Sequence, residues 1–289
     1  MQLFKGIERA IARLRQRRTL NRVMTVYGQE KVVNEYIEKS EIFLQNNSPI
    51  GTTSNIWVCW WQGEENMPEV VKVCYRSIKK LSGKHPVVLI TEENLKDYVQ
   101  LPQFIMDKYA AGIISKTHFS DILRFYLLKE YGGIWMDITN FITAEIDSFV
   151  PCESIFYSYK HITEYNNVSQ GLWTSYFNAS GKGNIIPSYL YDSLVRYWEK
   201  TDKLEDYLLL DFIFKLGYDN IPVMKKIIDS IPLREIGTMR KIMNRKWNEE
   251  EWKRYFIQAP FQKLSYKKYI NKTTKKGEKT HYAYMVENY

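Results

Sequence analysis

Two short apolar runs with a helical segment between them constrain the fold of this chain most. Residues 56–61, Ile-Trp-Val-Cys-Trp-Trp, and residues 86–91, Pro-Val-Val-Leu-Ile-Thr, have the continuous apolar character of strands that are buried on both faces of a parallel sheet. Between the runs, Pro68 opens a helical segment that ends near Gly83. Strand, helix and strand at this spacing predict a right-handed βαβ unit, and therefore an α/β fold.

The composition excludes several other classes of protein. With 45% hydrophobic and 26% charged residues, the chain is neither disordered nor collagen-like. It has no apolar run long enough to span a bilayer. Three cysteines without a C-x-x-C pair, and four scattered histidines, exclude a disulfide scaffold and a Cys-rich zinc site. We expect a reduced, cytoplasmic protein with one large domain.

The remaining sequence predicts helices around this sheet. A second helix at 29–46 is followed by a loop at 46–55, which places a helical appendage at residues 1–50 and the main domain at 51–289. A long helix at 117–131 leads into a short strand at Ile134–Asp137, and short strands and loops follow to residue 185. Further helices are predicted at 187–200, 204–217, 222–230 and 249–257, and a basic tail follows them.

The positive charge lies at the two ends of the chain. Residues 1–22 contain seven bases and one acid, and residues 240–279 contain thirteen bases and four acids. The segment between them is net negative, within a total of +8. The sequence lacks helix-turn-helix punctuation, zinc-finger spacing and RNP-like strands, so we expect no nucleic-acid partner.

The N-terminal segment predicts a basic amphipathic helix. Leu3, Ile7, Ile11 and Leu14 recur at helical spacing, and basic residues occupy much of the remaining surface. Such a helix can lie in the interface of an anionic membrane, or it can pack on the protein's own core with a solvated basic face. Amphipathicity alone does not separate these two interpretations.

The segment from 117 to 140 contains the strongest candidates for chemistry. Its helix is apolar almost all round from 122 to 128, and Asp121 and Arg124 interrupt this region at a spacing of i, i+3. Burying either charge alone would cost several kcal/mol, so the two side chains must pair with each other or with a ligand. A purely structural ion pair is the alternative.

Asp137 ends the strand that follows Gly132 and Gly133. By the period of two, Thr139 shares its face. A carboxylate at this place suits a divalent cation that carries a diphosphate. The alternative is that Asp137 caps a turn.

Together, these motifs resemble a known family. The stretches I-W-V-C-W-W-Q-G-E-E-N-M-P, S-D-I-L-R and Y-G-G-I-W-M-D resemble the capsular polysaccharide synthesis proteins, which are related to the Och1-like mannosyltransferases and the glucosylating toxins. The resemblance is strong over about residues 55–145 and weak to about 270. It implies a GT-A fold with a Rossmann-like, mostly parallel central sheet flanked by helices and a helical C-terminal part.

The resemblance also assigns roles to residues. It implies that Asp121 and Arg124 hold the hydroxyls of the donor sugar and that Asp137 is the first acid of a motif binding Mn²⁺ or Mg²⁺. Thr139 replaces the second acid of that motif. In the stretch Trp60-Trp61-Gln62, which belongs to the donor site, Trp61 would lie beside the nucleotide base.

Two later segments are further candidates. The stretch Lys263-Leu264-Ser265-Tyr266-Lys267 resembles one near the end of these proteins, so Lys263 and Ser265 are predicted to bind the donor diphosphate, unless they belong to a solvated tail. Asp211 lies in an apolar helical stretch and could face the acceptor or be a satisfied core carboxylate.

The resemblance therefore implies a retaining hexosyltransferase. Its donor would be a UDP- or GDP-linked sugar, and its acceptor a glycan, lipid-linked, in capsular or other cell-surface polysaccharide synthesis. We expect it at the inner face of the cell membrane, bound to the anionic surface. A sugar nucleotidyltransferase and a catalytically weak, membrane-associated scaffold of the same fold are the alternatives.

Overall fold

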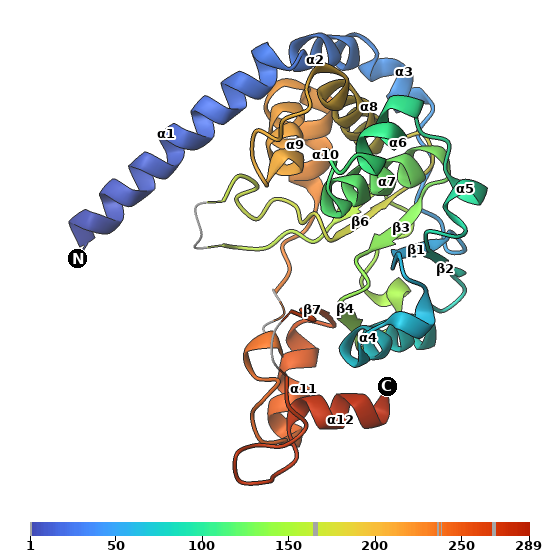
Figure 1. The fold of residues 1–289 in the computed structure, drawn as a ribbon, viewed down its shortest axis with the longest axis vertical. Coiled ribbons are helices and arrows are strands. Elements are labelled where there is room, and N and C mark those ends of the chain that lie inside the picture. The colour runs from blue at the N-terminus through green and yellow to red at the C-terminus, as the bar shows by residue number, and fades with distance from the viewer. Residues whose placement is uncertain (1, 164–166, 236, 238, 268–269) are drawn as a thin grey trace.

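A five-stranded sheet forms the centre of the molecule, in the order β2-β1-β3-β6-β5 (Figure 1). The computed structural model describes residues 2–163, 167–235, 237, 239–267 and 270–289. The strands are β1 (Ile56–Cys59), β2 (Val87–Ile90), β3 (Gly133–Met136), β5 (Phe156–Ser158) and β6 (Phe177–Ser180). Strand β1 is parallel to β2 and β3, and β6 is antiparallel to β3 and β5, so only β6 runs against the others. The predicted mostly parallel α/β sheet is confirmed.

The predicted βαβ unit is present. Helix α4 (Glu69–Lys80) follows Pro68 and connects β1 to β2, which pair in register from Ile56 with Val87 to Cys59 with Ile90. Glu69 in its first turn and the lysines in its last turn complement the helix dipole. Its buried apolar face packs beside β4 (Asn140–Ile142), as Figure 1 shows.

Helix α7 (Lys116–Glu130) packs on α8 (Ile185–Lys200) and leads directly into β3. Ser115 caps its first turn by accepting a hydrogen bond from the backbone N–H of His118. Gly133 has φ +103°, and a Cβ there would lie 2.4 Å from the carbonyl oxygen of Asn55. Only glycine therefore permits the tight reversal from helix to strand.

Three N-terminal helices precede the sheet: α1 (Gln2–Val26), α2 (Gln29–Glu38) and α3 (Ser40–Gln45). The helix predicted at 29–46 is interrupted at Lys39, and α2 packs on α8. Figure 1 shows α1 projecting from the body of the molecule towards the N-terminus. The division at residue 50 into appendage and main domain stays a prediction.

The two halves of α1 differ in their packing. Near its end, Val23 is fully buried and Arg22 Nε lies 2.8 Å from a carboxylate oxygen of Glu205. Earlier in the helix, Ile11 and Leu14 are 45% and 57% exposed. The side chains of Leu3 and Ile7, which belong to the same predicted stripe, lie outside the described residues. Core packing therefore accounts for the second half of the helix and not for Ile11 and Leu14.

The C-terminal part contains more structure than the predicted tail. Helices α10 (Pro222–Ser230) and α11 (Glu249–Gln258) agree with the prediction, but strand β7 (Phe261–Lys263) and helix α12 (His281–Asn288) follow where a basic tail was expected. Strand β7 pairs antiparallel with β4. In Figure 1, α11, β7 and α12 gather below the central sheet, on the side of α4, whereas α10 lies beside α9.

Helix α9 (Leu209–Asn220) begins later than the predicted residue 204. The hydroxyl of Tyr197 donates to the carbonyl oxygen of Lys203 at 2.7 Å and accepts from the N–H of Glu205 at 2.8 Å. The carboxylate of Asp206 accepts from the N–H of Leu208. These bonds hold the segment before α9 as turns.

The remaining short elements are α5 (Leu95–Tyr98), α6 (Gln103–Ala110), η1 (Glu64–Asn66), η2 (Ile146–Ser148) and η3 (Met239–Lys241). Among the described residues, no helix combines the length and the apolar character needed to cross a bilayer.

Candidate active site

A cavity of about 510 Å³ opens at the carboxyl ends of β1 and β3. Ligands bind at this edge in open α/β sheets. Ten residues singled out from the sequence all line it: Trp60, Trp61, Gln62, Asp121, Arg124, Asp137, Thr139, Asp211, Lys263 and Ser265. The structure thus brings together segments that lie as far apart in the chain as residues 60 and 265.

Arg124 connects the two acids of the central motif. Its Nη1 donates to Asp121 Oδ1 at 3.0 Å, and its Nη2 donates to Asp137 Oδ1 at 3.2 Å. The Arg124 side chain is 5% exposed and that of Asp121 12%. The guanidinium also lies 5.1 Å from the ring of Trp135, whose Nε1 donates to the same Asp137 oxygen. The expected pairing of Asp121 with Arg124 is present, and it extends to Asp137.

The two acids differ in their electrostatics. Burial raises the pKa of Asp121 to about 7, against the opposing effect of Arg124. Burial would also raise the pKa of Asp137, but the cations of Lys263 and Arg124 outweigh it and lower that pKa to about 2. Asp137 is therefore ionised at neutral pH, whereas burial moves the pKa of Asp121 towards neutral.

Lys263 lies between Asp137 and Thr139. Its Nζ donates to Asp137 Oδ2 at 2.6 Å and to Thr139 Oγ1 at 2.8 Å, and it lies 5.2 Å from the ring of Tyr176. Asp137 and Thr139 thus point to the same place, although residues 137–139 form a turn and not a continued strand. The pairing of β7 with β4 sets Lys263 opposite Asn140. It is this pairing that brings Lys263 to the motif.

The side chains around Asp137 offer a poor site for a divalent metal. Both carboxylate oxygens of Asp137 already accept from cationic or N–H donors, and the hydroxyl of Thr139 accepts from Lys263. Mg²⁺ and Mn²⁺ are bound by oxygen ligands, usually with more than one carboxylate or with phosphate. A metal ion bridging Asp137 and Thr139 would have to displace an ammonium group.

Aromatic side chains form one wall of the cavity. The ring of Trp60 meets that of Tyr266 edge to face at 5.4 Å, and half-buried Trp61 lies 5.5 Å from Phe119. The buried Trp60 Nε1 has no hydrogen-bond partner in the described part of the chain. Gln62 is exposed at the rim. This wall suits a flat, partly polar ring.

Asp211 lines the cavity at its boundary with a second cavity. Burial raises its pKa, and the bond from Trp173 Nε1 at 2.9 Å opposes that shift. The second cavity, of about 500 Å³, shares Ser175, Asp211 and Lys263 with the first. Asp211 is thus hydrogen-bonded, as the core interpretation requires, and also faces open space.

Several cavity residues were missed by the sequence reasoning. Thr117 and Ser120 line the cavity and stand four residues before Asp121 and Arg124. This spacing puts them on the same face of α7, so the signal was present in the sequence. Trp135 was treated only as a strand residue, and its bond to Asp137 could have been suspected from the period of two.

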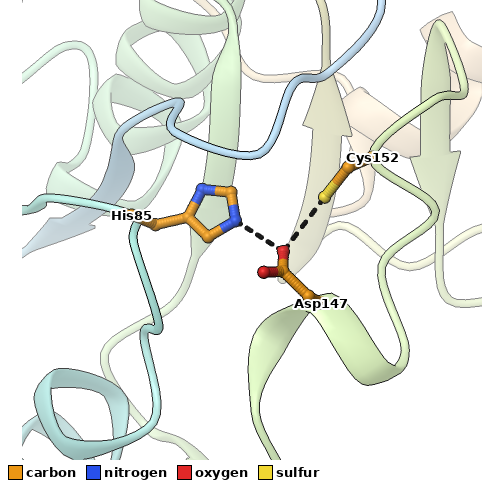
Figure 2. A group of neighbouring side chains, drawn as sticks. All are labelled: His85, Asp147 and Cys152. Atoms are coloured by element: carbon orange, nitrogen blue, oxygen red, sulfur yellow. Dashed lines mark hydrogen bonds and ion pairs between the residues drawn. The ribbon is translucent and has the colours of Figure 1, made fainter.

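A separate group of polar side chains lies at the other end of the sheet. His85 Nε2 is 2.9 Å from Asp147 Oδ1, and Cys152 Sγ donates to the same oxygen (Figure 2). His85 Nδ1 bonds to the carbonyl oxygen of Ser54. The bond from His85 is the main cause that lowers the pKa of Asp147, while burial and Asp147 raise the pKa of Cys152 to about 12. The group ties together loops at the amino ends of β1 and β2, away from the cavity.

The fold and the cavity define a GT-A-like protein. A mostly parallel sheet carries an aspartate turn after β3, and the preceding helix supplies the Asp–Arg pair that faces it. The chain belongs to the capsular polysaccharide synthesis protein family, whose sequence profile matches residues 3–285. That match includes all ten predicted site residues.

Curated relatives and a solved structure show further similarity. The chain is 27% identical over 119 residues to O-glycosyltransferase braB of Annulohypoxylon truncatum, and the aligned region covers 38% of this chain and 28% of that protein. It is 26% identical over 107 residues to O-glycosyltransferase PaGT of Phomopsis amygdali, covering 34% and 26%. The PaToxG glycosyltransferase structure matches with a TM-score of 0.43 and 18% identity, over 75% of this chain and 83% of that one. The chain therefore spans only about a quarter of the length of these two curated relatives.

Proposed function

We propose that this protein transfers a hexose from a nucleotide diphosphate sugar to a glycan acceptor. The observation that supports this most is the set of charges around Asp137. Arg124 and Lys263 converge on one carboxylate at the carboxyl edge of the sheet, inside a cavity with an aromatic wall. Such a site can hold a sugar, a diphosphate and a base side by side.

The donor sugar is assigned to Asp121 and Arg124. Both lie in the cavity with little exposure, where hydrogen bonds to hydroxyl groups are strong and selective. The base is assigned to Trp61, beside Trp60 and Gln62, and can be that of UDP or GDP. Stacking on an aromatic ring tolerates either base. Lys263 and Ser265 are assigned to the diphosphate.

Transfer breaks the bond between the anomeric carbon and the phosphate oxygen. The electron pair leaves with the nucleoside diphosphate, the acceptor hydroxyl oxygen bonds to the anomeric carbon, and its proton passes to the departing phosphate oxygen. Attack from the face on which the phosphate leaves retains the configuration. In this proposal, fixed cations near the leaving group lower the barrier by stabilising its developing charge.

The acceptor is assigned to the side of Asp211. The second cavity begins there and shares Lys263 with the donor cavity, so an acceptor hydroxyl entering from it would approach the reacting carbon. The aromatic rings of Trp173, Tyr176 and Phe261 line this cavity, which suits the apolar faces of sugar rings.

We further propose that the acceptor is lipid-linked, for capsular or other cell-surface polysaccharide, and that α1 binds the anionic inner face of the cell membrane. Ile11 and Leu14 are exposed among exposed arginines. Leu208 lines the donor cavity, and it also lines a cavity against Ile11 and Arg15 of α1. The exposed half of α1 therefore lies beside the segment that borders the proposed site.

GT-A-like glycosyltransferases usually use a divalent metal. The sequence predicts Mn²⁺ or Mg²⁺ at Asp137 and Thr139; these two side chains would hold such an ion, and it would supply positive charge for the diphosphate. It would compete with Lys263 for the same oxygens.

The scaffold alternative is favoured by one observation, the absence of a second acid at Thr139. Isothermal titration of the full chain with UDP- and GDP-sugars, with and without Mn²⁺, separates the possibilities. The proposal predicts saturable binding of one nucleotide sugar and slow release of its nucleoside diphosphate. Binding without any turnover supports the scaffold, and pyrophosphate release from a nucleoside triphosphate supports a nucleotidyltransferase.

A further inference from the structure

We propose that Lys263 takes the place of the divalent metal, so that the protein binds the diphosphate of its donor without a metal ion. This inference rests on the proposed function and specifies its chemistry. The Lys263 ammonium would supply the positive charge that stabilises the nucleoside diphosphate as it leaves the anomeric carbon.

The position of the ammonium group is the first argument. It donates to Asp137 Oδ2 at 2.6 Å and to Thr139 Oγ1 at 2.8 Å, the two atoms to which the sequence assigns a metal ion. An ammonium carries three N–H donors, so one remains for a phosphate oxygen. The Lys263 side chain is 27% exposed and lines the cavity, so a ligand can reach it.

The backbone around Lys263 is the second argument, because it fixes the ammonium to the motif. Strand β7 pairs with β4, which begins one residue after Thr139, and this pairing sets Lys263 opposite Asn140. The N–H of buried Leu264 donates to the carbonyl oxygen of Thr139 at 2.9 Å. A lysine in a solvated tail would have none of these restraints, so the placement is built into the fold.

The charge balance of the cavity is the third argument. Among the described residues that line it, the cations are Lys116, Arg124, Lys263 and Lys267, and the carboxylates are Asp121, Asp137 and Asp211. Arg124 and Lys263 both bond to Asp137, so this carboxylate is already neutralised. An arriving diphosphate meets excess positive charge without a metal, whereas an arriving divalent cation meets repulsion.

Thr139 fits the same account. A carboxylate there would give the site two acids for one lysine and would favour a divalent ion. A hydroxyl instead accepts the lysine N–H without adding charge. The missing second acid thus matches a lysine-based site, and it need not mean that the site has lost its function.

The test measures binding of UDP and of GDP to the full chain by calorimetry, in EDTA and in excess Mn²⁺. We expect one nucleotide to bind with the same Kd in both conditions. Lys263→Met should weaken binding in EDTA by about tenfold to a hundredfold, the range for losing a hydrogen bond to a charged group. The control is Lys279→Met, which removes a lysine that pairs with Glu287 away from the cavity, and it should not change the Kd.

A second variant keeps the test decisive if Lys263→Met alone loses stability. The double variant Lys263→Met with Thr139→Asp replaces the ammonium by a second acid, so its nucleotide binding should require Mn²⁺. Its melting temperature, measured beside that of the unchanged protein, shows whether it is folded.

Each outcome decides between the proposals. Nucleotide binding by the unchanged protein that is lost in EDTA and restored by Mn²⁺ overturns the inference and leaves the proposed function standing. Equal Kd values for Lys263→Met and the unchanged protein in EDTA also overturn it. If neither nucleotide binds in either condition, the proposed function fails and the inference fails with it.

Discussion

Replacing Arg124 with methionine is expected to destabilise the protein in a pH-dependent way. Arg124 is the only cation that bonds to Asp121 among the described residues, and both side chains are almost fully buried. Removing one partner of a buried ion pair costs about 3–5 kcal/mol when the other partner stays charged. Asp121 can avoid part of this cost by taking up a proton, so the loss depends on pH.

The direction follows from the pKa of Asp121. Burial raises it from 3.8 to about 7, so the folded protein binds this proton more tightly than the unfolded chain. The stability that this proton contributes is present at low pH and is lost as the pH rises from about 4 to about 7, after which the curve is flat. In Arg124→Met, the pKa of Asp121 rises further, because Arg124 is the main cause that lowers it. Above pH 7, the free energy of unfolding of the variant should therefore continue to fall, by up to about 1.4 kcal/mol per pH unit, whereas that of the unchanged protein stays level.

The assay is denaturant unfolding of both proteins at about pH 7 and about pH 9. A matched control is Lys253→Met, which removes a lysine that pairs with Glu249 on α11, where the two side chains are 65% and 66% exposed. The control should lose well under 1 kcal/mol, about equally at both pH values, as for surface pairs. Adding Asp121→Asn to Arg124→Met should remove most of the pH dependence. An equal loss of stability at both pH values for Arg124→Met would refute the reasoning.

Three further predictions concern substrate and membrane. Deleting residues 1–16, which spares the Arg22–Glu205 pair, should abolish salt-sensitive sedimentation with anionic vesicles while the melting temperature is kept. The control for exposed apolar residues is Ile42→Ser with Leu44→Ser on α3, which should sediment like the unchanged protein. Unchanged sedimentation of the truncated protein would contradict the membrane role. Trp61→Ala should weaken nucleotide binding by about 1–3 kcal/mol in calorimetry, as for the loss of a stacked base, and an unchanged Kd would place the base elsewhere. Asp211→Asn should raise KM for the acceptor and leave the Kd of the donor unchanged; the reverse pattern would move Asp211 to the donor side.

Local patterns in the sequence predicted the centre of the molecule well. Strands β1 and β2 follow from continuous apolar runs, and the Asp121–Arg124 pair follows from two charges three residues apart in a buried helix. Both patterns depend on a few neighbouring residues, so one sequence is enough to see them. The predicted start of α9 was wrong, because the hydroxyl of Tyr197 holds the turn before the helix. No local sequence pattern contains this contact.

The place of Lys263 could not be derived from spacing. Lys263 and Asp137 are separated by 126 positions, and they meet because β7 pairs with β4. Only the family resemblance indicated that the stretch around Lys263 belongs to the site. It assigned Lys263 to the donor diphosphate and did not indicate its bonds to Asp137 and Thr139. Long-range strand pairing of this kind depends on tertiary packing, so the sequence predicted a basic tail where a strand and a helix form.

The central claim is that the charges around Asp137 serve hexosyl transfer. The most direct test measures the release of nucleoside diphosphate from UDP- and GDP-hexoses by the purified full chain and by its Asp137→Asn variant. Asn keeps the shape of Asp137 but removes the negative charge that Arg124 and Lys263 share. The control is Asp219→Asn, which alters a surface ion pair with Lys215 on α9. We predict release by the unchanged protein and by the control, and a loss of at least about a hundredfold in Asp137→Asn, because Asp137 holds Arg124 and Lys263 in place at the leaving group. The melting temperature of the variant shows that it is folded. Full activity of Asp137→Asn at native stability, or no release of nucleoside diphosphate from any hexose donor, would contradict the account.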